Sequence, residues 1–412
     1  MVYLSLFETK KTFATCKILS VDDITRTDFK EFDSVTVAAN LLYEASFLKE
    51  IMQGEQYRDA WSTPVTVPIV FLDTLKGGMR IVKEGGGNQT HSIKIADSKG
   101  VLYTLRSLSK NPEPLIPEIA EDLHLENIVV DGVSAQHPYA ALLVAQLADA
   151  VDVLHTQPQL VFVPEQEALG DYNKKYGNRL YYLEYESEGP VNWTRLTNVK
   201  ELIDTDDLLE LQNKKEVPVI LNKNALIRAR LFDNIIGDWD RHAKQWGWAI
   251  QEHNGISTAT PIPTDRDNAF FKGDGIIPTL ITNDSFHPEV QSFDSEKVFD
   301  EGLVSKFDIY FLRNTTLAQF TDEAQQLSQL LTNEAIDNAF KIWPATIDSL
   351  DGKMLRDQIK HRRNNIVNTA AQFYKTIQAQ PKEELTLKGC EDVPLEGLMR
   401  YCFDCNQLLE KL

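Results

Sequence analysis

The chain has 412 residues, of which 42% are hydrophobic and 25% charged, and its formal net charge at pH 7 is −19. This length and composition predict a globular protein with two lobes or domains. The strong negative charge argues against a nucleic-acid-binding groove, because phosphates are repelled unless a local basic patch intervenes. The sequence has no apolar run of about 18 residues or more, so no transmembrane helix is expected.

The ends of the chain do not determine its compartment. The start, Met1–Glu8, has no basic segment ahead of a long apolar stretch, so it is not typical of a signal peptide. An export signal removed upstream would leave no trace, and export therefore stays open. The four Cys residues are Cys16, Cys390, Cys402 and Cys405. Cys402 and Cys405 form a single CxxC without a matching pair, which favours a disulfide or buried thiols over a zinc site.

Residues 1–78 predict a mixed N-terminal extension that packs on the lobe after it. Within this extension, the apolar spacing of Val35–Glu50 predicts an amphipathic helix that serves packing only. Pro64–Phe71 predicts a strand that leads into Asp73.

Residues 79–110 predict three strands, with a glycine-rich loop between the first two. In chain order these are the strand Met79–Glu84, the loop Gly85, Gly86, Gly87, Asn88 and Gln89, and the strands Ser92–Ala96 and Val101–Leu108. Glycines let a backbone approach phosphate closely, with its N–H groups pointing at the anion. This order is therefore typical of a lid over a nucleotide, and Arg106 on the third strand is placed to pair the phosphates. The alternative is a flexible turn, which is what most glycine runs form.

Two helices are expected next, at Ile116–Ser134 and Pro138–Ala150. Glu126 lies in the apolar part of the first helix. It is the candidate partner of Arg106, against the alternative that it is one more solvent-exposed helix Glu.

Short apolar strands are expected at Leu160–Val163 and Arg179–Glu184, and they would complete a five-stranded sheet. The run Glu186–Pro190 follows and is typical of a strand that leaves a sheet for a hinge. We therefore expect an N-lobe over residues 79–188.

After residue 188 the composition becomes mainly helical, and we expect a C-lobe over residues 189–380. The predicted helices are Asp204–Lys214, Val298–Phe311, Leu317–Leu331, Glu334–Ile342 and Met354–Ile377. Residues 381–412 are expected to form a tail that carries the CxxC. The sequence thus predicts an α+β protein with an antiparallel-sheet N-lobe and a mainly helical C-lobe.

Two acidic loops lie in the C-lobe, about 25 residues apart. An apolar helix ends at Gly237, a common helix exit, and the first acidic loop, Asp238–His242, follows it. A short strand is expected at Trp246–Gln251. The second acidic loop, Asp265–Phe271, begins Asp-Arg-Asp and ends with two Phe residues.

Carboxylates on two loops suit a site that holds a divalent cation and activates a hydroxyl group. The alternative is a pair of Asp-rich surface turns. Trp239, Trp246 and Trp248 favour the functional interpretation, because they bury the neighbourhood, and buried Asp or Arg is rarely left without a partner.

The stretches Ile236–Trp246 and Asp265–Phe270 resemble loops of the atypical kinases that have a protein-kinase-like fold. These kinases include the HipA-like bacterial kinases, the secretory-pathway kinases and the type II phosphatidylinositol kinases, whose catalytic loops run Asp-x-His or Asp-Arg-His. The stretches GGGNQ, LRSLSK and SAQHPYAALLVAQLADA look closest to bacterial proteins that carry such a kinase-like domain. The resemblance covers most of residues 75–375 and implies a bilobal kinase-like fold that uses ATP and Mg²⁺.

Carried over by position, the resemblance makes Asp240 the base that orients the acceptor hydroxyl and accepts its proton. Gln245 stands where many of these kinases have a metal-binding Asn. Asp265 matches the Asp that holds Mg²⁺, with Asp267 as the fallback ligand. Arg106 stands for the phosphate-pairing Lys. Two positions, Gln245 and Arg106, depart from the family pattern. Gln is a poorer ligand than Asn for a hard cation, and the planar guanidinium of Arg donates several hydrogen bonds in a fixed geometry, whereas the ammonium of Lys acts as a point charge.

The resemblance therefore implies phosphate transfer from ATP to a hydroxyl of a protein, lipid or small molecule. Two alternatives stay open. One is a catalytically silent nucleotide-binding protein or scaffold on the same fold. The other is a metal-dependent phosphohydrolase that uses Asp240, Asp265 and Asp267. The shortage of His residues near the loops, where only His242 and His253 occur, counts against the hydrolase.

Overall fold

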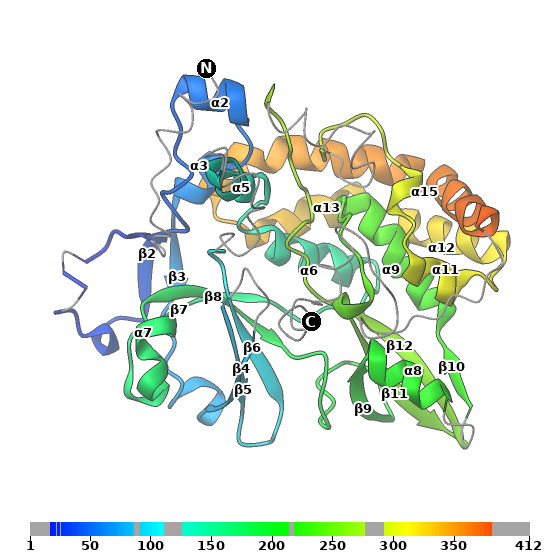
Figure 1. The fold of residues 1–412 in the computed structure, drawn as a ribbon, viewed down its shortest axis with the longest axis horizontal. Helices are drawn as coiled ribbons and strands as arrows, with labels where there is room; N and C mark the ends of the chain where they lie inside the picture. The colour runs from blue at the N-terminus through cyan, green and yellow to red at the C-terminus, as the bar shows by residue number, and fades with distance from the viewer. Residues whose placement is uncertain are drawn as a thin grey trace, which may run out of the picture.

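A computed structural model describes residues 17–85 apart from 22 and 25, and residues 91–110, 126–213, 218–276 and 292–380. In the view of Figure 1 the two larger sheets lie in the lower half of the molecule and the longer helices lie above them. All four Cys residues, the CxxC among them, lie outside the described residues.

The larger N-terminal sheet has five antiparallel strands in the order β4-β5-β6-β8-β7. Their bounds are β4 Arg80–Gly85, β5 Ser92–Ala96, β6 Leu102–Ser107, β7 Gln159–Val163 and β8 Arg179–Tyr185. Buried and half-buried residues alternate along β6, so Tyr103 and Leu105 face an apolar core while Thr104 and Arg106 face the other way. The predicted five-stranded sheet is confirmed, and its pleat turns Arg106 away from that core.

The helix predicted at Val35–Glu50 is wrong over most of its length. Residues Ser34–Ala38 form strand β2, and only Phe47–Gln53 form a helix, α2. The alternation of β-branched residues explains the difference, because Val35 and Val37 lie fully buried opposite matching Val residues of the next strand, β3 (Pro64–Pro68). Together with β1 (Lys17–Ile18) these strands form a small antiparallel sheet, and the strand expected at β3 is confirmed.

Three further helices belong to the first half of the chain: α3 (Arg58–Ser62) leads into β3, whereas α5 (Glu126–Gly132) and α6 (Ala140–Ala150) lie between β6 and β7 in sequence. The last two occupy parts of the predicted helical segments, and residues 111–125 lie outside the described residues. Most side chains of α6 are buried, because the helix lies between the sheet region and the C-terminal helices (Figure 1).

A second sheet, which the sequence did not predict as a unit, has the strand order β10-β12-β11-β9. Its strands are β9 Val199–Asp204, β10 Val219–Leu221, β11 Trp246–His253 and β12 Ile256–Pro263, and α8 (Thr205–Asn213) follows β9. Two Pro residues in β12 argue against a central strand. The structure tolerates them because β10 pairs only with Ser257–Ala259, so that Pro261 and Pro263 have a strand neighbour on one side.

The C-terminal region is mainly helical, as predicted. Its main helices are α9 Lys223–Ile236, α11 Lys306–Leu312, α12 Leu317–Leu330, α13 Asn333–Ala339 and α15 Lys353–Ala379. The helix predicted at Val298–Phe311 is correct only in its last part, because Ser305 closes a capping box that starts α11. None of the described helices is long and apolar enough to cross a bilayer.

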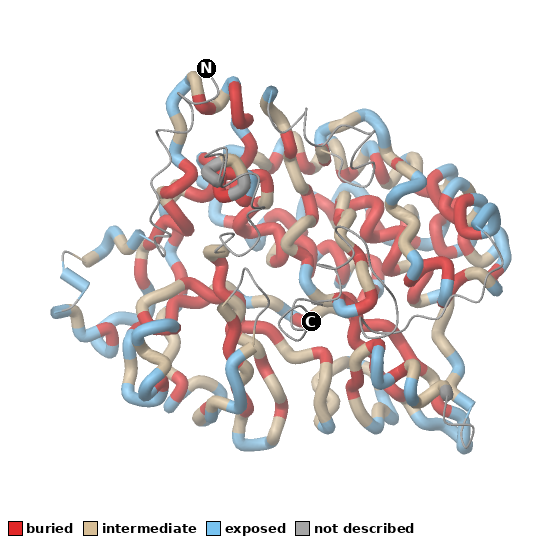
Figure 2. Tube along the Cα trace, viewed as in Figure 1, coloured by how far each residue is buried: buried red, intermediate tan, exposed pale blue. Residues whose placement is uncertain are grey.

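One large apolar core joins α6, α9 and the C-terminal helices to the inner faces of the sheets, and Figure 2 shows the buried segments concentrated there. The α+β class, with an antiparallel-sheet N-terminal region and a helical C-terminal region, is confirmed. The four predicted segment boundaries, 1–78, 79–188, 189–380 and 381–412, stay predictions.

Candidate active site

The first acidic loop begins where α9 ends. Gly237 adopts a left-handed conformation with φ of 66°, and a Cβ placed there would lie 2.5 Å from a ring carbon of Phe293. The position therefore needs glycine both for its backbone angle and for its space. This exit turns the chain sharply and places Asp238 and Asp240 beyond the end of the buried helix.

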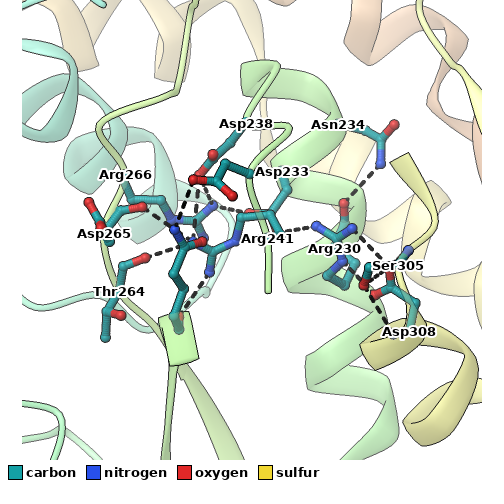
Figure 3. A network of polar contacts seen from close by, with 12 residues as sticks. Arg230, Asp233, Asn234, Asp238, Arg241, Thr264, Asp265, Arg266, Ser305 and Asp308 are labelled. Atoms are coloured by element: carbon teal, nitrogen blue, oxygen red, sulfur yellow. Dashed lines mark hydrogen bonds and ion pairs between the residues drawn. The ribbon is translucent and has the colours of Figure 1, made fainter. Parts of the chain in front are cut away.

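A buried network of charges ties both acidic loops to α9 (Figure 3). Asp233 on α9 accepts hydrogen bonds from Arg230 over 2.7 Å and from Arg266 of the second loop, and Arg241 Nε of the first loop lies 3.3 Å from it. Arg241 Nη1 also donates to the carbonyl of Thr264 over 2.7 Å. The carboxylate of Asp233 and the guanidinium of Arg241 thus bring the two loops together, although the loops are about 25 residues apart in sequence.

Asp238 belongs to this network and is almost fully buried, with 3% of its surface exposed. Burial raises its pKa to about 8, against the pull of the nearby Arg241. Its Oδ2 lies 3.3 Å from an Arg266 nitrogen. A carboxylate enclosed in this way serves to hold the two loops together.

Asp240, the predicted base, lies at the boundary between this network and the second loop. Its Oδ2 accepts hydrogen bonds from Asn268 Nδ2 over 3.2 Å and from Gln245 Nε2 over 3.4 Å. Burial raises the pKa of Asp240, and the charge of Asp265 adds to the rise. A carboxylate whose pKa lies above its ordinary value is a stronger proton acceptor when ionised.

Arg106 reaches from β6 to the second acidic loop. Its Nη1 donates to Asp265 Oδ1 over 3.0 Å and forms an ion pair with Asp267, while its Nη2 donates to Glu184 Oε1 on β8 over 2.8 Å. Burial works against its charge, but these three carboxylates raise the pKa of Arg106 well above its ordinary value. The structure therefore joins the cation predicted to face phosphates with both aspartates predicted to hold metal.

The two aspartates of the second loop differ in environment. Asp265 has a positive φ of 49°, and 47% of its side chain is exposed. Asp267 is mostly covered, and Lys110 Nζ lies 3.0 Å from its Oδ2. Although burial opposes it, the charges of Arg106 and Lys110 hold the pKa of Asp267 well below its usual range. Asp267 thus forms largely buried ion pairs with cationic side chains, whereas the carboxylate of Asp265 is half exposed to solvent.

Among the residues that the structure describes, no three His, Cys, Asp or Glu side chains lie together as a metal site. That is compatible with Mg²⁺, which usually takes one or two carboxylates and completes its shell with water and substrate phosphates. The half-exposed carboxylate of Asp265 fits this requirement. Gln245 is less available, because its Oε1 accepts a hydrogen bond from Arg241 over 3.1 Å.

The other predicted site residues are only partly described. Gly85 ends β4, whereas Gly86, Gly87, Asn88 and Gln89 lie outside the described residues. Glu126 opens α5, but its side chain also falls outside the described part. The roles expected for these residues, as for Asp240, Gln245, Arg106, Asp265 and Asp267, stay predictions.

Sequence reasoning missed two contributors to the site. Glu184 faces Arg106 from the neighbouring strand, and the alternation of β8, which puts Tyr182 and Glu184 on one face, could have indicated it. Asn268 contacts Asp240 directly, and its place just after the Asp-Arg-Asp run was the only signal.

No family model matches the chain, and a search of curated proteins finds no similar sequence. Among solved structures, the Helicobacter pylori proinflammatory kinase CtkA is 14% identical, with a TM-score of 0.36, covering 70% of this chain and 94% of that one. HipA, from the Shewanella oneidensis MR-1 toxin–antitoxin complex with HipB and operator DNA, is 9% identical, with a TM-score of 0.36, covering 72% of this chain and 67% of that one. Both have atypical protein-kinase-like folds.

Proposed function

We propose that the chain is an ATP- and Mg²⁺-dependent phosphotransferase that acts on a hydroxyl group of a protein, lipid or small molecule. The observation that carries the proposal is the meeting of Arg106, from the five-stranded sheet, with Asp265 and Asp267, from the second acidic loop. Phosphoryl transfer depends mainly on positioning and charge neutralisation, and this arrangement supplies cations and carboxylates at one place.

The nucleotide would be held mainly by charge. Arg106 and Lys110 both form ion pairs with carboxylates of the second acidic loop, so they are the groups proposed to pair the phosphates. The glycine-rich loop after Gly85 would cover them. Asp265 would hold Mg²⁺, since its carboxylate is half exposed, and the bound cation would neutralise charge on the phosphate oxygens.

Asp240 would act on the acceptor. As the acceptor oxygen bonds to phosphorus, its proton passes to the Asp240 carboxylate, and ADP leaves with the electron pair of the broken P–O bond. Two features support this role. Amide donors from Asn268 and Gln245 fix the carboxylate, and burial raises its pKa.

Incubation of the purified chain with radiolabelled ATP and Mg²⁺ tests the proposal, with Asp240→Ala as the inactive control. Turnover of ATP in the wild type and its loss in Asp240→Ala would support phosphotransfer. ATP binding without turnover in either protein would make the chain a nucleotide-binding scaffold. Hydrolysis of simple phosphoesters without ATP would make it a phosphohydrolase, so each alternative has its own outcome.

A further inference from the structure

Asn268 lies between Asp240 and a glutamine from a distant part of the chain. Its Nδ2 donates to Asp240 Oδ2 over 3.2 Å, and its Oδ1 accepts from Gln136 Nε2 over 2.6 Å. An ionised carboxylate only accepts hydrogen bonds, so the amide nitrogen of Asn268 must face Asp240 and its oxygen must face Gln136. Chemistry alone therefore fixes the orientation of both amide groups.

Gln136 is held in turn by the N-terminal region. Its backbone N–H closes the short turn after α5 by donating to Val133 over 3.0 Å. Its carbonyl accepts a hydrogen bond from the indole of Trp61, on α3, over 2.9 Å. Trp61 is 2% exposed and packs edge-on against Tyr43. A row of hydrogen-bonded groups thus runs from a buried indole on α3 to the Asp240 carboxylate.

We propose that Gln136 and Asn268 are positioning residues that hold the Asp240 carboxylate in the orientation it needs to accept a proton. This inference rests on the proposed phosphotransfer function. The other amide donor to Asp240, from Gln245, lies at 3.4 Å and is the longer of the two contacts, so Asn268 is the better-placed donor. Both donors approach Oδ2, so they set the tilt of the carboxylate without using Oδ1.

The contact has an electrostatic consequence as well as a geometric one. An amide that donates to a carboxylate favours its ionised form. Removing the donor should therefore make Asp240 harder to ionise and move the acidic limb of the activity profile to higher pH. A residue with a purely structural role would lower the amount of active protein without moving that limb.

Two variants of the full chain, Asn268→Ala and Gln136→Met, test the inference by their effect on ATP turnover with Mg²⁺. Gln378→Met is the matched control for the loss of a side-chain amide donor, since Gln378 lies on α15 and donates to the backbone carbonyl of Arg313, outside both acidic loops. We expect kcat to fall about tenfold to 100-fold, because small misplacement of a catalytic group has effects of that size. KM for ATP should change less than about threefold, as expected when orientation and not uniform binding is lost.

The double variant should lose no more activity than Asn268→Ala alone, because Gln136 acts through Asn268. If Asn268→Ala does not fold, the kcat and pH profile of Gln136→Met decide the question. Values of kcat and of the acidic limb that match Gln378→Met would overturn the inference.

A second measurement separates this inference from the proposed function. In protein labelled with ¹³C at the Asp carboxyls, the Asp240 signal, assigned with Asp240→Asn, can be followed against pH. Its midpoint should lie at higher pH in Asn268→Ala than in the wild type. An unchanged midpoint would overturn the positioning role, whereas absence of ATP turnover in the wild type would overturn only the proposed function.

Discussion

Arg106 donates a hydrogen bond to Asp265 over 3.0 Å, although the two residues are 159 positions apart in the sequence. The bond joins β6 of the five-stranded sheet to the second acidic loop. Arg106 also pairs with Glu184, whose side chain is largely buried. The guanidinium therefore links the two regions and also balances the charge of a buried carboxylate.

Replacing Arg106 by Ala should destabilise the chain by about 3–5 kcal/mol, because it leaves Glu184 buried without its cation. The matched control is Arg195→Ala, since Arg195 pairs with Asp152 on the surface, where such pairs are worth about 0–1 kcal/mol. Urea unfolding of both variants measures the difference. Equal losses of stability would show that the Arg106 pairs are energetically no more than surface contacts.

Asp267 should make the folding stability of the chain depend on pH in the acidic range. Its folded pKa lies well below its ordinary value of about 4, so its stabilising effect is complete above that value and is lost as the pH falls. We therefore expect Asp267→Asn to be less stable than the wild type at pH 7, with the difference shrinking below about pH 4. Urea midpoints at pH 7, 5 and 3 provide the check, and a difference that stays constant across this range would contradict the ion pairs with Arg106 and Lys110.

Tyr57 should hold the end of the second acidic loop in place. Its buried hydroxyl donates to the carbonyl of Phe270, which has a positive φ of 62°. In Tyr57→Phe that carbonyl loses its donor, at an expected cost of about 1–3 kcal/mol, and hydrogen exchange in residues 265–276 should become faster.

Tyr181→Phe is the control for this variant, since its hydroxyl also donates to a backbone carbonyl, that of Tyr176, but within the sheet region. It should lower stability without changing exchange in the second acidic loop. Identical exchange in that loop for the two variants would rule out a local role for Tyr57.

Local sequence signals predicted the elements that carry the site. The strands β4, β5 and β6 follow one another closely in the sequence, and α9 shows a helical apolar period that ends at a glycine. Such signals need no information from distant residues. The same reasoning failed at β2, where the apolar spacing fitted a helix while pairing with β3 decided for a strand.

The missed site contacts are those between distant parts of the chain. Gln136 and Asn268 are 132 residues apart, and no spacing rule connects them. The pairing of Arg106 with Glu184 depends on β6 and β8 being neighbours in the sheet, with α5 and α6 inserted between them in sequence. Residue type was enough to identify the carboxylates of the two acidic loops as candidates. Their contacts with distant residues depend on the fold and could not be predicted from the sequence.

The central claim is that carboxylates from both acidic loops serve one reaction, and ATP turnover in Asp240→Asn and Asp265→Asn tests it most directly. Asp337→Asn is the control, since Asp337 on α13 pairs with Lys360 on α15 and its half-exposed side chain lies outside both acidic loops. We expect turnover to fall at least about 100-fold in both site variants and to be unchanged in the control, with ATP binding retained in Asp240→Asn. Turnover near the wild-type rate in either site variant would contradict the account.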